Sequence, residues 1–533
     1  MKASARPGLY TALFAAATLI VLVLAYIPII RAHQGWEDEI FWFSTCLSMI
    51  RHQKPVPSVL NDFAGTHSPL RFYGPTLFWA GALVMKIFGT TVRIWRSYAF
   101  AGNVAFLLAV ALLFRRLSRS WCSIAIVAFV FSLSLGGSFG FSLPGRPDAW
   151  TLGVILLALA VAGRERGHPS ETGGAFNLRW LSFGILMGVA ASTTPRCWPL
   201  LFFLLATLPM LVAKNRLRSV LIVAVGCLVT LTLLLLPMHT TPWGHVLFVQ
   251  QASSNDKVNI SPLMGGAWGF GHSTTQLMYY GTLLIIIGLL FLPRWSEQEA
   301  FGKWLLVAGL LNLFATLLLV SRALNMSTYW AFPLEIVAML GFTQYGKGRG
   351  ARFARRLGVL MLIYMAVLRT ARELPVVMHW KDRDPAPRAA EIAAVIPPGS
   401  LVYGPVGQYF YPTLKSGSEY RYLVERTTPG LSSTPGRIDS ETPMIAACRS
   451  RAYLVWPTDT DGEALPQLAH ASMSRVADHR ALPQYISHFE QMVERVPGGR
   501  SEPDEEGFVV YRLQMDPQYC DNVTDGRAPY AVR

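Results

Sequence analysis

Long apolar runs recur along this 533-residue chain, and they limit its fold more than any other feature. They are about 18 to 22 residues long, which suits a helix crossing about 30 Å of hydrocarbon. Because lipid cannot satisfy unpaired backbone groups, a bundle of transmembrane helices is the expected fold. We count eleven runs, near residues 9–30, 97–114, 120–141, 149–163, 181–194, 198–213, 219–237, 275–293, 304–320, 331–345 and 357–371.

The formal net charge of +15 is unevenly distributed, and its distribution predicts an orientation in the membrane. Residues 381–533 hold 16 basic and 20 acidic side chains, whereas the rest of the chain holds 31 basic and 12 acidic ones. Most of the basic excess lies in alternate short loops, which the positive-inside rule places in the cytoplasm. We therefore expect a multi-pass protein of the bacterial inner membrane with a cytoplasmic N-terminus. This pattern requires no nucleic-acid partner.

The composition changes near residue 381, and this change predicts two domains. Residues 1–380 form the expected transmembrane domain, and residues 381–533, rich in Pro, Gly and alternating charge, form a small periplasmic α/β domain. Cys448 and Cys520 are its only two cysteines, so they either form a disulfide or stay unpaired. We expect a helix over residues 389–396 and strands over 401–403, 451–456 and 508–513.

The first outer loop, near residues 31–96, is long and contains helical patterns of its own. Its first pattern predicts a helix on the membrane surface, with Asp38 on roughly the opposite side from an apolar stripe. Its second pattern, Leu70 to Phe88, is apolar but interrupted by Pro75 and Gly81, which predicts a re-entrant or interfacial segment. The apolar stripe consists of Trp36, Ile40, Phe43, Leu47 and Ile50.

Polar side chains at the outer ends of membrane helices are costly to keep there, so they mark candidate sites. Single members have simpler explanations: Asp148 suits a helix N-cap, Arg196 a helix end, and Glu335 a bond between helices. The basic members lie on the side that the charge rule disfavours, which an anionic lipid phosphate would explain. The candidate residues are Asp38, Glu39, Asp148, Glu335, His67, Arg71, Arg93, Arg96, Arg146, Arg196 and Arg322.

Carboxylates and arginines in this combination favour sugar transfer from a polyprenyl-phosphate carrier. Such a donor already has a leaving group, so the enzyme needs a base for the acceptor hydroxyl and cations for the departing phosphate. In a single inverting displacement the base is Asp38, with Glu39 as its close substitute. The partners are then the membrane, a lipid-linked sugar donor and an acceptor that is an envelope lipid, glycan or protein.

Four short motifs, in order, resemble the membrane glycosyltransferases of the C-type fold. The similar families are the bacterial lipid A aminoarabinose transferases, the protein O-mannosyltransferases and the rhizobial lipopolysaccharide sugar transferases. The resemblance covers roughly residues 1–210 and extends to the aromatic-proline stretch Tyr329 to Pro333. The motifs are Trp36-Glu37-Asp38-Glu39, His67-Ser68-Pro69-Leu70-Arg71-Phe72-Tyr73, Ile87-Phe88-Gly89 with Arg93 and Arg96, and Arg146-Pro147-Asp148-Ala149.

The resemblance implies roles for particular residues. It makes Asp38 catalytic, and it places Ser68 where the aminoarabinose transferases often carry a lysine that contacts the lipid phosphate. We therefore expect Arg71 to supply that charge. His67 stands where some relatives place a metal ligand, so a divalent metal is an alternative to a hydrogen-bonding role for this side chain.

Two other classes of function stay open at the level of sequence. A secondary transporter would show internal repeats and paired charges near the bilayer midplane, and neither is evident. A non-enzymatic scaffold with a partner-binding periplasmic domain is compatible with the sequence, because residues 382–533 carry no catalytic signature. We expect this domain to help present the acceptor or to cover the site.

Overall fold

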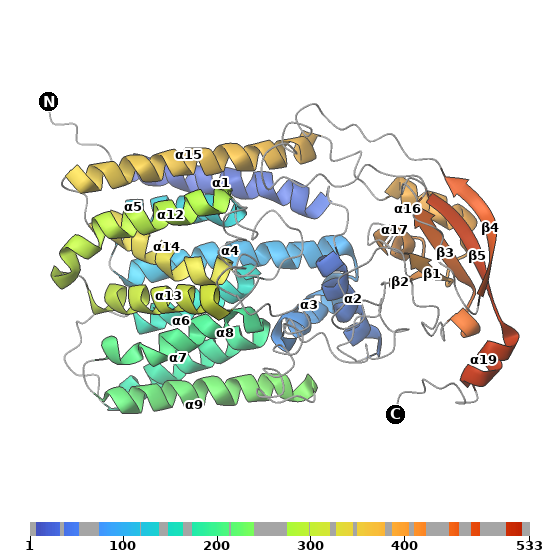
Figure 1. Ribbon diagram of the computed structural model, residues 1–533, viewed down its shortest axis with the longest axis horizontal. Helices are drawn as coiled ribbons and strands as arrows, with labels where there is room; N and C mark the ends of the chain where they lie inside the picture. The colour runs from blue at the N-terminus through green and yellow to red at the C-terminus, as the bar shows by residue number, and fades with distance from the viewer. Residues whose placement is uncertain are drawn as a thin grey trace.

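The computed structural model is a long helical bundle with a sheet at one end (Figure 1). It describes residues 7–31, 37–52, 74–117, 119–137, 148–163, 173–212, 215–238, 274–297, 299–319, 327–344, 349–378, 386–404, 410–422, 447–457, 471–479 and 508–524. The bundle helices are α1 (Pro7–Arg31), α4 (Val92–Arg116), α5 (Trp121–Gly137), α6 (Asp148–Ala162), α7 (Gly173–Thr193), α8 (Trp198–Ala206), α9 (Arg216–Leu235), α12 (Thr274–Leu290), α13 (Ala300–Leu319), α14 (Ser327–Gln344) and α15 (Arg349–Met378). Short 3₁₀ turns are η2 (Pro195–Cys197), η3 (Leu208–Met210), η4 (Leu236–Met238) and η5 (Leu292–Glu297).

In the described residues, each of the eleven apolar runs lies on helical structure, and the run near 198–213 is divided most clearly. There α8 ends at Ala206 and η3 follows, because Pro209 has no backbone N–H to continue the helix. Among the described residues, α4 and α9 are long and apolar enough to cross a membrane, and seven shorter apolar helical stretches of 10–17 residues accompany them. The number of membrane crossings stays a prediction.

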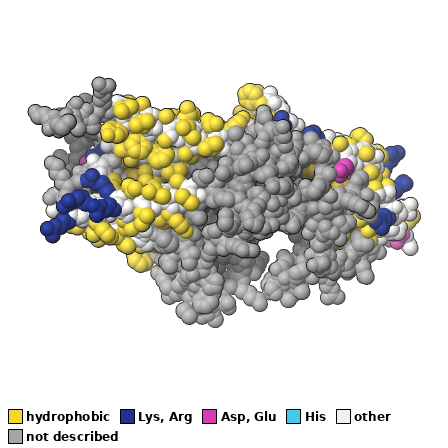
Figure 2. All heavy atoms as spheres, turned by 90° about the horizontal axis from the view of Figure 1, so that it is seen from above, with side chains coloured by type: hydrophobic (Ala, Val, Ile, Leu, Met, Phe, Trp, Pro, Cys, Tyr) yellow, Lys and Arg dark blue, Asp and Glu magenta, His cyan; other side chains and the backbone are white. Residues whose placement is uncertain are grey.

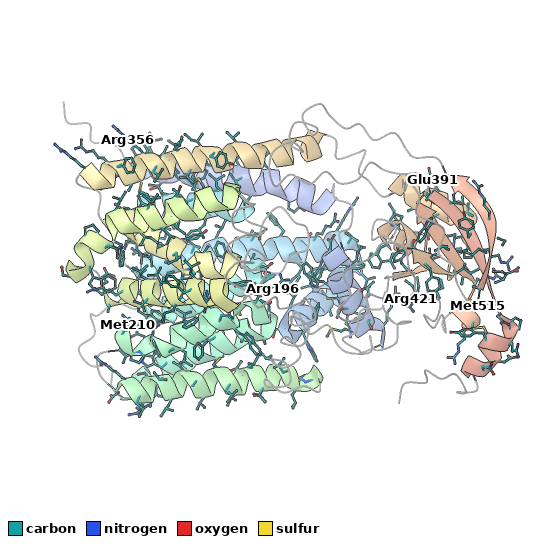
Figure 3. All side chains as sticks on the ribbon, viewed as in Figure 1. Arg196, Met210, Arg356, Glu391, Arg421 and Met515 are labelled. Carbon is teal, nitrogen blue, oxygen red and sulfur yellow. A yellow bond between two sulfur atoms is a disulfide. The ribbon has the colours of Figure 1, made fainter. Side chains whose placement is uncertain are left out.

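The described part of the bundle face in Figure 2 is largely apolar, with basic side chains at the end away from the sheet. On α15 the side chains of Val359, Leu360 and Ile363 are 55–64% exposed, which suits lipid and not water. The first turns of the same helix carry exposed Arg352 and Arg356. Figure 2 shows one cluster of basic side chains at the end of the bundle away from the sheet and others on the sheet region, and Figure 3 places Arg356 at the end away from the sheet.

Two shorter helices, α2 (Glu37–His52) and α3 (Pro75–Phe88), lie between the bundle and the sheet (Figure 1). They coincide with the two helical patterns predicted in the first outer loop. The predicted place of the first helix on the membrane surface is wrong, because Ile40, Phe43 and Leu47 of its apolar stripe are buried in a core shared with the sheet region. Proline at the first position of α3 suits a helix start, where its missing N–H is not needed. Just before it, the N–H of Gly74 donates to the Thr193 carbonyl oxygen at 2.9 Å. A Cβ on Gly74 would collide with the Ser192 backbone, so glycine permits this approach of α3 to α7.

The C-terminal residues form a mixed five-stranded sheet in the order β2-β1-β3-β5-β4. Strand β1 is parallel to β2 and β3, while β5 is antiparallel to β3 and β4. The predicted helix and three predicted strands coincide with α16, β1, β3 and β5; the predicted boundary near 381 lies outside the described residues. The elements are α16 (Ala386–Val395), β1 (Leu401–Gly404), α17 (Phe410–Lys415), β2 (Glu419–Tyr422), η8 (Ala447–Arg449), β3 (Ala452–Pro457), β4 (Ala471–His479), β5 (Phe508–Met515) and α19 (Pro517–Thr524).

The sheet packs against the end of the bundle, because α2 and α3 share a hydrophobic core with it. Buried side chains of α2, α3 and the start of α4 pack in one cluster with residues of α16, α17 and the strands. Phe43 of α2 meets Phe410 of α17 edge to face, with ring centroids 5.9 Å apart. A second cluster holds the bundle together. The sheet and the end of the bundle are therefore joined through α2.

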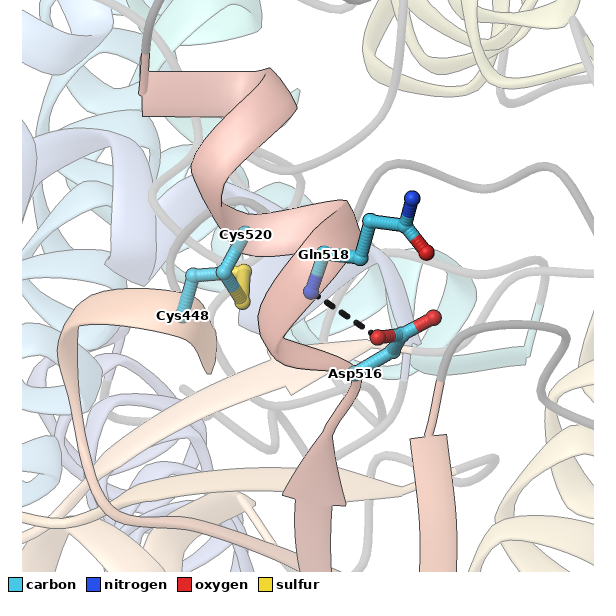
Figure 4. The surroundings of a disulfide bond; sticks show 4 residues. All are labelled: Cys448, Asp516, Gln518 and Cys520. Carbon is cyan, nitrogen blue, oxygen red and sulfur yellow. Dashed lines mark hydrogen bonds between the residues drawn. A yellow bond between two sulfur atoms is a disulfide. The ribbon is translucent and has the colours of Figure 1, made fainter.

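A disulfide joins Cys448 of η8 to Cys520 of α19 (Figure 4). From the sequence, these two cysteines were either disulfide-bonded or unpaired, and in the structure they are bonded. The carboxylate of Asp516 accepts a hydrogen bond from the Gln518 N–H at 2.9 Å, which caps the first turn of α19. The disulfide thus links α19 to η8, the short turn that precedes β3.

Candidate functional site

Helix α2 brings the predicted acidic residues to the end of the bundle that faces the sheet (Figure 1). Asp38 and Glu39 lie in its first turn, where the positive end of the helix dipole favours carboxylates. The structure places the backbone of Asp38 in this turn and does not describe its side chain.

Glu39 forms a buried ion pair with Arg96 of α4. The Arg96 Nε atom donates to Oε1 of Glu39 at 2.7 Å, and its Nη2 atom donates to Oε2 at 3.0 Å. Both side chains are almost inaccessible to water, at 0% and 3% exposure. Two parallel bonds between a planar fork and a carboxylate fix orientation as well as distance. The pair therefore anchors the first turn of α2 to the first turns of α4.

Asp148 is held in a second buried polar group, on the first residue of α6. Its Oδ1 atom accepts a hydrogen bond from the hydroxyl of Tyr329 at 2.6 Å, and its residue is 3% exposed. The Tyr329 carbonyl oxygen in turn accepts from the side-chain amide of Asn312 at 3.3 Å. Helices α6, α14 and α13 are thus tied together around this carboxylate, whose charge also suits the N-terminus of α6.

Hydroxyl groups extend the polar contacts across α3, α6 and α7. The Oγ1 atoms of Thr151 and Thr193 are 2.6 Å apart, and Thr76 bonds to Ser192 through their hydroxyls. The indole N–H of Trp150 donates to the Tyr98 carbonyl oxygen at 3.0 Å, which sets the start of α6 beside α4. These bonds satisfy polar groups that lipid could not, and they join α3, α6 and α7 at this end of the bundle.

The remaining predicted site residues divide into those that the structure describes and those that it does not. Arg196 is half-buried in η2 and lies at the end of the bundle toward α2 and α3 (Figure 3). Arg93 is exposed on the first turn of α4. Glu335 is buried on α14, six residues beyond Tyr329. The predicted residues outside the described part of the chain are His67, Arg71, Arg146 and Arg322.

The phosphate-binding role predicted for Arg96 stays a prediction, and the geometry adds a structural role for it. The bidentate bond to Glu39 occupies much of the guanidinium, whereas Arg93, one turn earlier on α4, is exposed. Within the described residues, no three His, Cys, Asp or Glu side chains are grouped as metal ligands would be.

Sequence reasoning did not single out Tyr329 or the threonine pair Thr151 and Thr193. Tyr329 lay inside the aromatic-proline stretch already noted, so a signal for it was present. The threonines gave none, because an isolated hydroxyl in an apolar run is common in membrane helices and its partner is defined only by packing.

Comparison with solved structures shows that this chain has the C-type glycosyltransferase fold. ArnT from Cupriavidus metallidurans bound to undecaprenyl phosphate superposes with a TM-score of 0.53 at 16% identity, covering 95% of this chain and 98% of that one. The apo state of the same protein gives 0.50 at 15% identity, covering 94% and 97%. No protein-family model and no curated protein matches the chain.

Proposed function

We propose that this protein is an inverting membrane glycosyltransferase that takes a sugar from a polyprenyl-phosphate carrier. Its support is the fold, which ArnT shares in a structure bound to undecaprenyl phosphate, together with the acidic first turn of α2. The single observation that carries the proposal is the buried ion pair between Glu39 and Arg96. It holds the acidic first turn of α2 at the end of the bundle where Asp148 accepts its hydrogen bond from Tyr329.

The proposed reaction is one displacement at the anomeric carbon. The oxygen of the acceptor hydroxyl attacks the anomeric carbon while Asp38 takes the proton of that hydroxyl. The bond between the anomeric carbon and the phosphate oxygen of the carrier breaks. The electron pair leaves on the phosphate oxygen, and arginine side chains stabilise the developing charge. Arg93 and Arg196 are the described candidates for this role, and Arg71, Arg146 and Arg322 are the others. Glu39, paired with Arg96, positions the helix that carries the base.

The decisive experiment compares Asp38→Asn with Glu37→Gln, its neighbour in the same turn. Purified full-length protein is given a radiolabelled polyprenyl-phosphate sugar and membranes from a strain that lacks the protein. Loss of a general base lowers the rate by about 10²- to 10⁴-fold. We expect this loss for Asp38→Asn alone, with unchanged membrane insertion and thermal stability. Full transfer by the Asp38→Asn protein would refute the proposed mechanism.

We also propose that the sheet lies in the periplasm and the basic end of the bundle in the cytoplasm. Its support is the gathering of basic side chains at the end opposite the sheet (Figure 2) and the disulfide within the sheet region. Alkylation of the free thiols before lysis, followed by non-reducing gel analysis, tests this orientation. A pair of reduced thiols at Cys448 and Cys520 in intact cells would contradict it.

A further inference from the structure

The first turns of α15 carry arginines that the proposed reaction does not use. Arg349, Arg352, Arg355 and Arg356 are all exposed, and Figure 3 places Arg356 at the end of the bundle away from the sheet. The positive end of the helix dipole lies at the same turns, so it opposes cationic side chains there. These arginines are therefore costly in isolation, and an anion beside them would remove that cost.

Within the described part of the chain, no acidic side chain supplies this anion. The ion pairs there involve Arg51, Arg96, Arg119 and Arg421, and none of them involves α15. The guanidinium groups at the start of α15 are thus accessible to a ligand.

Three of these arginines lie on the side of α15 that faces away from the bundle. At about 100° per residue, Arg349, Arg352 and Arg356 fall within an arc of about 60°. The opposite side carries Ala351 and Ala354, which are buried in the core of the bundle. We call the outward set, Arg349, Arg352 and Arg356, the arginine face.

An exposed apolar stripe continues the arginine face along the same side of the helix. Its four side chains are 55–64% exposed, and together with the arginine face they fall within about 100° of arc. Figure 2 shows the basic side chains at this end of the bundle next to a hydrophobic surface. One side of α15 is therefore basic at its start and apolar beyond it. The α15 stripe consists of Val359, Leu360, Ile363 and Val367.

This pattern has the length and the polarity of a phospholipid in one leaflet. At 1.5 Å per residue, the arginine face covers about 10 Å of the helix axis and the α15 stripe about 12 Å. One leaflet holds about 15 Å of hydrocarbon, half the thickness of a bilayer core. Guanidinium groups bind phosphate oxygens through paired hydrogen bonds, whereas acyl chains suit exposed apolar side chains. A soluble polyanion would contact the arginines but leave the stripe uncovered.

We propose that the arginine face and the α15 stripe form a binding site for an anionic phospholipid, with its phosphate against Arg352 and Arg356 and an acyl chain along the stripe. A lipid with net negative charge is favoured over phosphatidylcholine, because the choline ammonium of the latter repels the arginines. The proposal goes beyond sugar transfer, since these residues lie at the other end of the bundle from the acidic turn of α2 (Figure 1).

The test measures the first bound lipid by native mass spectrometry of the full-length protein in a neutral detergent. We expect dioleoyl-phosphatidylglycerol to bind at least about tenfold more tightly than dioleoyl-phosphatidylcholine, with an affinity that falls as salt rises. The double variant Arg352→Gln/Arg356→Gln should bind phosphatidylglycerol about 20-fold more weakly, since each arginine near an anionic lipid contributes about fivefold.

Two exposed arginines of α9 provide the matched control. Arg216 and Arg218 lie in the first turn of that helix, about 160° apart around its axis, so they form no common face. Arg216→Gln/Arg218→Gln removes the same charge and should change phosphatidylglycerol binding by less than about twofold. Equal weakening by the two double variants, or equal binding of the two lipids by the wild type, would overturn the proposal.

Thermal unfolding in nanodiscs gives opposite expected results in the two lipids. In phosphatidylcholine, Arg352→Gln/Arg356→Gln should unfold at the temperature of the wild type or above it, because the helix dipole no longer opposes two cations. In phosphatidylglycerol the wild type should be the more stable protein, because it alone retains the site. A double variant that is less stable to the same extent in both lipids would contradict the proposal, because the arginines would then stabilise the fold without an anion.

A competitor without acyl chains separates a phospholipid from other anions. Glycerophosphoglycerol has the same headgroup, and it should displace phosphatidylglycerol at least about 100-fold less effectively than the lipid itself. Displacement by glycerophosphoglycerol or by inorganic phosphate at the concentration of the lipid would show that the stripe is not used, and the proposal would be wrong.

Two further measurements exclude a second copy and separate this proposal from the catalytic one. A dimer of the wild type in phosphatidylcholine, lost in Arg352→Gln/Arg356→Gln by light scattering, would sink the lipid site, because a second copy would then cover the arginine face. Asp38→Asn should bind phosphatidylglycerol as the wild type does. Failure of the lipid site and failure of the proposed reaction therefore give different results.

Discussion

Breaking the buried pair between Glu39 and Arg96 should release α2 from the bundle. Removing one partner of a buried ion pair costs about 3–5 kcal/mol, because the other charge is left without its counter-ion. The side chains are 0% and 3% exposed, so solvent screening reduces this cost little. Glu39→Gln and Arg96→Gln should each destabilise the docked state of α2 by this amount. That free energy corresponds to an increase of about 100-fold to a few thousand-fold in the population of the open state.

Cys46 provides a local reporter for this opening. It is fully buried on α2, and its thiol lies 3.6 Å from the carbonyl oxygen of Phe78 in α3. Burial raises the pKa of the Cys46 thiol above its usual value, so the docked thiol is protonated as well as inaccessible. Its alkylation therefore requires α2 to leave α3. The alkylation rate of the Cys46 peptide, followed by mass spectrometry, measures the open population.

The control and the double variant make the result interpretable. Glu299→Gln removes a half-exposed carboxylate that lies 3.4 Å from Arg119, and it should leave the Cys46 rate unchanged. The double variant of Glu39→Gln with Arg96→Gln leaves two neutral amides, so its destabilisation should be smaller than the sum of the single effects. An unchanged Cys46 rate in Glu39→Gln would show that the pair does not hold α2, and the positioning role argued for it would be wrong.

Three further predictions concern the other contacts of the site and the sheet. Tyr329→Phe removes the hydroxyl that donates to Asp148, and loss of this charged hydrogen bond should cost about 1.5–3 kcal/mol of folding free energy. We expect a lower thermal midpoint and slower sugar transfer. An unchanged midpoint would contradict this prediction. Phe410→Ala should cost about 3–5 kcal/mol of packing where the sheet docks on α2, so limited proteolysis should cut the sheet region faster. Cys448→Ser opens a 72-residue loop closed by Cys520 and should destabilise the sheet region by about 4 kcal/mol, with the bundle unaffected in thermal unfolding.

The helices of the bundle were readable from the sequence because lipid imposes a simple rule on every residue of a span. Where the structure describes them, the apolar runs lie on helical structure, and the runs near 198–213, 219–237 and 275–293 extend past the end of an α-helix into a 3₁₀ turn that contains proline. Helix α2 was also predicted, since its apolar stripe has a clear helical period, but its burial against the sheet region and not on the membrane surface was not. Strands β2 and β4 were missed. Strand β2 has only four residues, and β4, although nine residues long, is mostly exposed and polar, so both carry little hydrophobic signal and depend on their neighbours in the sheet.

The sequence predicted individual residues of the candidate site but not the contacts between them, for a physical reason. The sequence alone determined which residue types are costly in a membrane, and so it selected Glu39, Arg96 and Asp148 individually. Only the tertiary structure decided which of them meet: Glu39 pairs with Arg96 across 57 residues, and Asp148 bonds to Tyr329 across 181. A hydrogen bond needs its two groups within about 3 Å of each other, and packing alone determines that distance between helices far apart in the sequence. Local composition fixes the cost of each charge, and the fold determines its partner.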